Sequence, residues 1–127
     1  MQGLHLFEYA VIRVVPRVER EEFMNVGVIL YCAKQKFLQA VFVLDEDRLA
    51  AFSNQLDIAA IAANLNAMAR ICKGGKGSGP IGQLDLPSRF RWLTATRSTI
   101  VQTSKVHPGF CTHAGETLNR LLIEQVL

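Results

Sequence analysis

Three apolar segments of strand length in the first 44 residues constrain the fold more than any other feature of this chain. Residues 7–15, 26–33 and 37–44 are rich in β-branched and aromatic side chains, which favour strands. The first segment stops at Pro16, and only Lys34-Gln35-Lys36 separates the second segment from the third. A polar connection that short predicts a hairpin, so we expect the three segments to form an antiparallel sheet.

The first of these segments carries one charged residue in an apolar setting. Strand alternation places Arg13 on the face that also carries Phe7, Tyr9, Val11 and Val15. Both faces of the segment are largely apolar, which is typical of a central strand. A buried arginine needs a partner, and Glu22 is available in the charged connection that follows. We therefore expect a structural ion pair between Arg13 and Glu22.

Helical periodicity dominates the second half of the chain. Within residues 57–73, apolar side chains recur at intervals of three and four, which predicts an amphipathic helix ending in Lys73-Gly74. Shorter helices are predicted over 46–52, 87–95 and 114–126, a fourth strand over 98–105, and a turn at His107-Pro108-Gly109. The expected fold class is α+β, a mainly antiparallel four-stranded sheet with helices packed on it, and residues 1–127 are expected to form a single domain.

Composition limits the setting in which the protein works. No apolar run approaches the roughly 18 residues of a membrane helix, and residues 1–7 lack the pattern of a signal peptide. The three cysteines are an odd, widely spaced set, which fits neither a disulfide framework nor a zinc site. We expect a cytoplasmic protein with no cofactor and no metal. Whether Cys111, His107 and His113 have a chemical role stays open.

Positive charge is concentrated in residues 70–107, which carry seven basic side chains against Asp85 alone, although the whole chain is only +3. Such a stretch favours anionic partners. Guanidinium forks bind carboxylate and phosphate, and hydroxyl groups complete such sites. The expected anion-binding residues are Arg89, Arg97, Ser98 and His107, although His107 joins the others only if the strand ends early or bends. The competing interpretation is a solvated edge strand whose arginines pair with nearby carboxylates.

Two separated groups of short motifs resemble a bacterial family known as domain of unknown function 3037. The first group is Tyr9-Ala10-Val11-Ile12-Arg13-Val14-Val15-Pro16 followed by Glu22-Phe23-Met24-Asn25-Val26-Gly27-Val28. The second is Gly79-Pro80-Ile81-Gly82, Arg89-Phe90-Arg91-Trp92-Leu93, Arg97-Ser98-Thr99, Gln102 and Val106-His107-Pro108-Gly109. The resemblance spans nearly the whole chain. It implies a small stand-alone protein that is often encoded beside a HipA-like kinase, and hence a partner of that kind, but it implies no reaction.

Three functional hypotheses follow from the sequence. The first is a non-enzymatic binding or accessory protein, because no set of catalytic residues has a standard spacing. The alternative is an enzyme or ligand-binding domain for a phosphate- or carboxylate-bearing substrate, acting through the expected anion site. The third is nucleic-acid binding through residues 70–107. The sequence leaves the ligand, the oligomeric state and the question of catalysis open.

Overall fold

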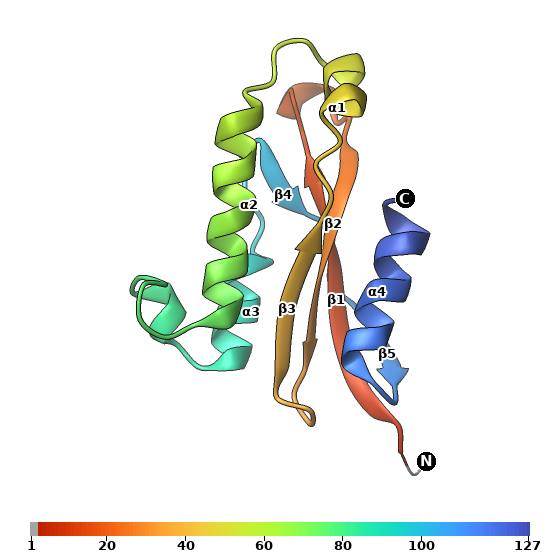
Figure 1. Ribbon diagram of the computed structural model, residues 1–127, viewed down its shortest axis with the longest axis vertical. Coiled ribbons are helices and arrows are strands. Elements are labelled where there is room, and N and C mark those ends of the chain that lie inside the picture. Colours follow the sequence, from red (N-terminus) through yellow and green to blue (C-terminus); the bar gives the residue numbers. More distant parts are fainter. Residues whose placement is uncertain (1–2) are drawn as a thin grey trace.

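The computed structural model describes residues 3–127 as an antiparallel sheet with helices on both faces (Figure 1). The strands are β1 (His5–Val14), β2 (Met24–Cys32), β3 (Phe37–Phe42), β4 (Val101–Thr103) and β5 (His107–Cys111). The α-helices are α1 (Glu46–Phe52), α2 (Ile58–Lys73), α3 (Leu86–Leu93) and α4 (Ala114–Gln125), with short 3-10 turns at Val18–Arg20 and Ile81–Gln83. The α+β class is therefore confirmed. None of the helices in this part of the chain is both long and apolar enough to cross a bilayer.

Strand β1 is the centre of the sheet, as its two apolar faces predict. The order is β3-β2-β1-β4, and β5 also pairs with β1. One edge of β1 pairs with β2, whereas the other edge is shared by β4 near Arg13 and by β5 near Phe7. Ser104 bridges these two short strands, because its N–H donates to the carbonyl oxygen of Val11 and its hydroxyl accepts from the Val11 N–H, both at 2.8 Å.

The fifth strand corrects two predictions, the turn at residues 107–109 and the four-stranded sheet. His107, Pro108 and Gly109 pair with Tyr9, Glu8 and Phe7 of β1. Proline is tolerated here because β5 lies at a sheet edge, where its missing N–H costs no ladder bond. Gly109 is required by packing, since a Cβ atom there would lie only 2.5 Å from the Phe7 ring. The predicted strand over 98–105 shortens to the three residues of β4.

Each face of the sheet has its own core. Helices α2 and α3 cover one face, where side chains such as Ile12, Ile29, Leu65 and Leu93 are fully or almost fully buried. Helix α4 packs on the other face, over Val28, Leu30 and Cys32 among others. Figure 1 shows that α4 covers only part of the length of its face, so the end of β1 that carries Arg13 lies beyond it.

Three helices, α1, α2 and α3, begin after an aspartate that caps the N-terminus of the helix. The Oδ1 atoms of Asp45, Asp57 and Asp85 accept backbone N–H groups three residues further on, at 3.1, 3.1 and 2.9 Å. Such caps satisfy donors that have no partner inside the helix and favour the positive end of its dipole. Helix α2 follows the predicted pattern, with Ile61, Leu65 and two further apolar residues buried.

Candidate binding site

Arg13 occupies the most unusual environment of the polar side chains on the sheet. It lies between Asn25 of β2 and Gln102 of β4, which pair with it from either side. Its Cζ atom is 3.9 Å from the centre of the Phe23 ring, a cation–π geometry. Its Nε atom is buried and has no hydrogen-bond partner. Burial lowers the pKa of Arg13 from its ordinary value, because desolvation penalises the charged form.

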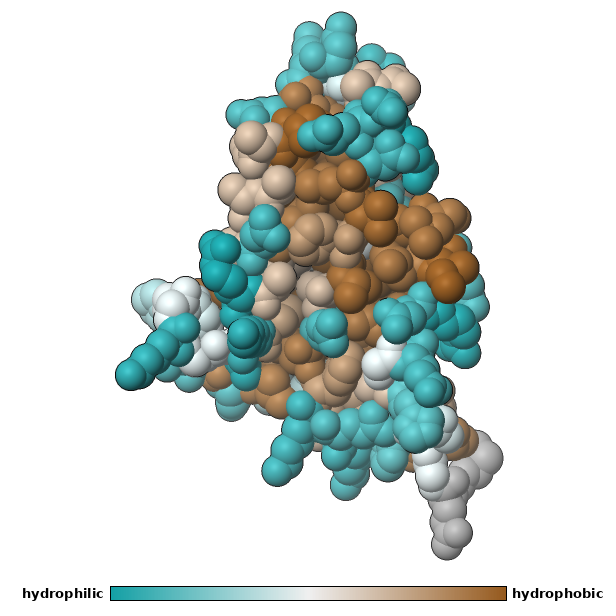
Figure 2. Space-filling model, viewed as in Figure 1, coloured by the Kyte–Doolittle hydropathy of each residue, from teal (hydrophilic) through white to brown (hydrophobic). Residues whose placement is uncertain are grey.

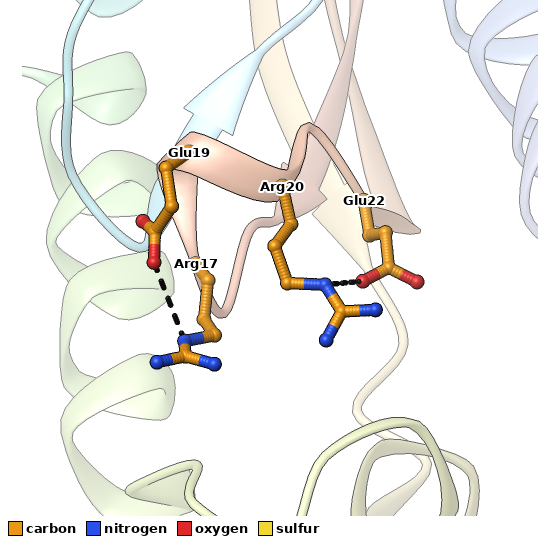
Figure 3. Close-up of polar contacts among 4 residues, drawn as sticks. All are labelled: Arg17, Glu19, Arg20 and Glu22. Carbon is orange, nitrogen blue, oxygen red and sulfur yellow. Dashed lines mark ion pairs between the residues drawn. The ribbon is translucent and has the colours of Figure 1, made fainter.

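The ion pair expected between Arg13 and Glu22 is not formed among the described residues, which corrects that prediction. The Glu22 carboxylate lies 2.7 Å from Nε of Arg20, and the neighbouring pair joins Arg17 to Glu19 at 3.4 Å (Figure 3). Successive side chains of an extended segment point to opposite sides, so Phe23 turns onto the sheet and Glu22 turns away from it. The aromatic ring of Phe23 therefore takes the place that the sequence assigned to a carboxylate.

A hollow of about 410 Å³ opens beside the Arg13 side chain. We call it the Arg13 hollow, and its lining residues are Arg13, Val15, Val18, Glu21, Phe23 and Gln102. It combines one cation with an aromatic ring and aliphatic walls. Glu21 contributes the only carboxylate of this lining, yet within residues 3–127 no ion pair involves Arg13. The hollow therefore presents a positively charged group that has no ion-pair partner within residues 3–127.

Asn25, directly opposite Arg13, contains a second buried polar atom without a partner. Its Nδ2 donates to the carbonyl oxygen of Gln125 at 3.0 Å, which orients the amide, whereas its Oδ1 atom accepts no hydrogen bond. Asn25 lines a smaller hollow of about 260 Å³, and Phe23 belongs to the walls of both hollows. An unsatisfied donor and an unsatisfied acceptor thus lie on paired residues, at the end of the sheet where α4 stops.

Arg89, the first residue of the expected anion site, serves a different purpose. Its Nη1 atom donates to the carbonyl oxygens of Ile71 and Cys72 at 2.9 and 2.8 Å, and its Nε donates to that of Leu84 at 2.9 Å. These acceptors include the last turn of α2, where carbonyl groups lack partners inside the helix. Arg89, a residue of α3, therefore caps the C-terminus of α2 and uses most of its N–H groups to bind backbone carbonyl oxygens.

Arg97 behaves in the same way at the end of α3. It donates to the carbonyl oxygens of Leu93 (3.1 Å) and Trp92, and its guanidinium lies 4.4 Å from the centre of the Trp92 ring. Ser98 is exposed, and His107 packs on Tyr9 with 5.4 Å between ring centres. The two arginines bind carbonyl groups at different helix ends, and His107 belongs to β5. The structure does not bring the four expected residues together as one anion site.

The cysteine and histidine residues near the chain end form no metal centre in the described part of the chain, where no cluster of three ligand-type side chains occurs. Cys111 is buried, and burial is the largest cause that raises the pKa of its thiol. His113 stands at the N-cap of α4 without a side-chain capping bond. No chemistry that joins Cys111 to His107 or His113 follows from this geometry.

One family model matches nearly all the residues that form this fold. The model of a family described as "Protein of unknown function (DUF3037)" matches residues 9–126, nearly the whole chain. The chain belongs to the DUF3037 family. All residues that line the Arg13 hollow lie within the matched part of this DUF3037 protein. No curated protein and no solved structure matches the chain, so the DUF3037 family supplies a classification without an activity.

Sequence reasoning found Arg13 but missed the residues around it. Phe23, Asn25 and Gln102 were visible only as parts of motifs, although Asn25 lies in β2 opposite Arg13. One signal was available in this DUF3037 sequence: Phe23 is the only aromatic residue in the largely charged connection of residues 17–23. An apolar side chain in such a place often packs back on the sheet that the connection leaves.

Proposed function

We propose that this protein is a non-enzymatic binding protein that holds an acidic segment of a protein partner in the Arg13 hollow. The observation that carries the proposal is the Arg13 guanidinium, which lies over Phe23 beside an open hollow and has no carboxylate partner among the described residues. A partly desolvated cation gains more from an anionic ligand than a fully hydrated one. A carboxylate can accept two parallel N–H groups from one guanidinium, which adds geometric specificity.

The rim of the hollow favours a peptide segment over a small hydrophilic anion. Val18, Phe23 and Ile100 are 44%, 46% and 46% exposed, although large apolar residues usually lie inside. Val18 and Phe23 line the hollow, and the carbonyl oxygen of Ile100 accepts the N–H of Val15, a third lining residue, at 2.6 Å. A ligand with apolar side chains next to its carboxylate would cover these residues and bind Arg13 in the same step.

Glu21 limits the kind of acidic segment that fits. Its backbone is left-handed (φ 57°), which closes the short turn after Val18–Arg20 and sets this carboxylate on the wall of the hollow. A second negative charge on the ligand would meet Glu21 and be repelled. The hollow therefore suits one carboxylate between apolar neighbours better than a run of acidic residues.

The titratable groups of the hollow support binding rather than catalysis. They are Arg13 and Glu21, and no histidine, cysteine or lysine lines it. General acid–base and nucleophilic mechanisms need a base within hydrogen-bond reach of the reacting group, commonly oriented by a third residue. The protein partner is proposed to be a HipA-like kinase, the class that the family resemblance suggests, which makes such a kinase the first protein to test.

A peptide array tests the proposed function. Peptides with one Asp or Glu at each position of an apolar frame are probed with the wild-type protein, Arg13→Gln and Arg70→Gln. Arg70 is an exposed arginine of α2 outside the hollow, so its variant controls for net charge. We expect one acidic position to be enriched by wild type and Arg70→Gln, with at least a tenfold loss of affinity for Arg13→Gln.

Two outcomes would contradict the proposed function. One is binding of acidic peptides that Arg13→Gln retains. The other is thermal stabilisation by inorganic phosphate or acetate that depends on Arg13 while no peptide binds, because the ligand would then be a small anion. The kinase is tested by mixing the purified proteins: a complex that survives Arg13→Gln would exclude the hollow as the contact.

A further inference from the structure

The outer edge of β3 is an unpaired end of the sheet. The N–H of Val43 donates inward to the carbonyl oxygen of Val26 at 2.7 Å. Because backbone groups of successive strand residues point to opposite sides, those of Leu38, Ala40 and Phe42 point away from β2. Nothing pairs with this edge as a strand in the described chain, since β3 stands last in the sheet order.

This edge lacks the features by which proteins protect open strands. Residues 37–44 read Phe-Leu-Gln-Ala-Val-Phe-Val-Leu, with no charge and no proline. Exposed edges normally carry lysine, proline or a bulge, because an unpaired apolar strand is a template for pairing with another chain. Val43 is 38% exposed, and the pairs between β2 and β3 are regular throughout. An uncharged edge without a bulge or a proline is a template for pairing with another strand.

The surface around the edge is apolar as well. Figure 2 shows hydrophobic colour across the middle of this side of the molecule, between α2 and α4 and reaching the end of α4. Ile123 of α4 and Leu127, two residues beyond the helix, are 62% and 69% exposed. On α2, Asn64 and Met68 face α3 and β4, so the stripe with Ala62 and Ala69 lies on the other flank of the helix. Small side chains on that flank allow close approach.

We propose that β3 pairs antiparallel with β3 of a second copy of this chain, which joins two sheets into one across a two-fold axis. An antiparallel strand pair is self-complementary under such an axis. Placing Ala40 opposite Ala40 of the second copy sets Leu38 opposite Phe42, and the backbone groups of all three point into the new ladder. This inference is independent of the Arg13 hollow, which lies on β1 and β4.

Charge at the two ends of β3 favours a second copy over an unrelated strand. Lys34 and Lys36 precede the strand, whereas Glu46 and Asp47 follow it at the start of α1, and all four are exposed. In the antiparallel arrangement each end of one β3 meets the opposite end of the other. The lysines before one β3 then lie at the same end of the interface as the acidic residues after the other β3, so both ends carry opposite charges.

One contact already reaches this edge from within the chain. The backbone of Ala40 lies close enough to the Cys72 thiol of α2 to affect its pKa. A thiol is a weak hydrogen-bond acceptor, so a carbonyl group of a second strand would replace it as the partner of the Ala40 N–H.

A charge exchange across the interface tests the proposal in full-length protein. Variant one is Lys34→Glu with Lys36→Glu, and variant two is Glu46→Lys with Asp47→Lys. Each variant alone sets like charges against each other at both ends of the interface. Mixed together, the two variants restore opposite charges at both ends. Asp45, the cap of α1, is left unchanged in both, and circular dichroism checks that each variant is folded.

Sedimentation velocity measures the oligomeric state at protein concentrations of about 1–200 μM. This range covers a micromolar dissociation constant. We expect a wild-type dimer, at least tenfold weaker dimers of each variant alone, and recovery of the dimer in the mixture. Amide exchange of Leu38, Ala40 and Phe42 should slow as the wild type dimerises. A wild-type monomer throughout this range overturns the proposal, and so does a dimer whose affinity neither variant changes.

Discussion

The Nη1 atom of Arg89 lies 2.8 Å from the carbonyl oxygen of Cys72, so a side chain of α3 closes the C-terminus of α2. The same nitrogen also binds the Ile71 carbonyl at 2.9 Å. A cation at this end of a helix satisfies orphan acceptors and opposes the negative end of the helix dipole. Arg89 thereby links two helices that are separated by a glycine-rich loop and that also share an apolar core.

The first prediction concerns this cap. Arg89→Met should lower the free energy of unfolding by about 2 kcal/mol or more, because three charge-assisted hydrogen bonds are lost and carbonyl groups are left without partners. Arg91→Met, an exposed substitution on the same helix, should change stability by less than about 0.5 kcal/mol. Urea unfolding of both variants measures the difference. Equal small effects would show that the cap contributes nothing.

The second prediction compares two glycines of the same loop. Gly74 and Gly75 both have positive φ, 73° and 79°, so both substitutions by alanine are strained. A Cβ atom at Gly74 would lie 2.6 Å from Nη1 of Arg89, whereas one at Gly75 would meet nothing within 4 Å. Gly74→Ala should therefore cost about 3 kcal/mol and Gly75→Ala about 1 kcal/mol. The melting temperatures of the two variants in the same buffer give their order of stability. A lower melting temperature for Gly75→Ala than for Gly74→Ala would refute this account of Gly74.

The third prediction uses the pKa of the Cys72 thiol. Burial raises this pKa to about 12, whereas an unfolded cysteine ionises near about 8.5. As pH rises, the Cys72 thiol therefore loses its proton in the unfolded state before it does so in the folded state. The contribution of this thiol to stability is fully present below about pH 8.5 and is lost as pH rises towards the pKa of the folded state. Wild-type stability should fall across this alkaline window by up to about 1.4 kcal/mol per pH unit for this group.

Cys72→Ala supplies the control for this pH dependence. The variant loses packing at all pH values, but its stability should fall less steeply above about pH 8.5, because one ionising group is gone. Thermal unfolding between pH 7 and pH 10.5 gives both curves. Parallel curves would mean that Cys72 does not titrate differently in the folded and unfolded states.

Local sequence rules predicted the helices and the central sheet well, because their signals are short-range. Asp57 with the apolar spacing after it specifies α2, and Lys34-Gln35-Lys36 specifies the β2–β3 hairpin. Strand β5 was not predicted, because the contact that explains its sequence is between residues far apart in the chain. Pro108-Gly109 is typical of a turn, yet Gly109 is present because the Phe7 ring, a hundred residues earlier, lies against it.

The candidate site was only partly predictable for a similar reason. Alternation along β1 placed Arg13 on the correct face, but no local rule says whether a carboxylate or the Phe23 ring lies over it. Arg89 and Arg97 were assigned to an anion because their donors are conspicuous in the sequence. The acceptors that bind them are backbone carbonyl groups at helix ends, which every helix has and no residue type marks.

The most direct test of the Arg13 hollow as a binding site is the Nε–H resonance of each arginine, followed by NMR during titration with an acidic peptide from the array. The buried Nε of Arg13 has no hydrogen-bond partner, whereas that of Arg89 donates to Leu84. We predict that the Arg13 signal shifts with peptide concentration and saturates, while the Arg89 signal stays in place. Saturable binding that leaves the Arg13 signal unmoved would contradict the account.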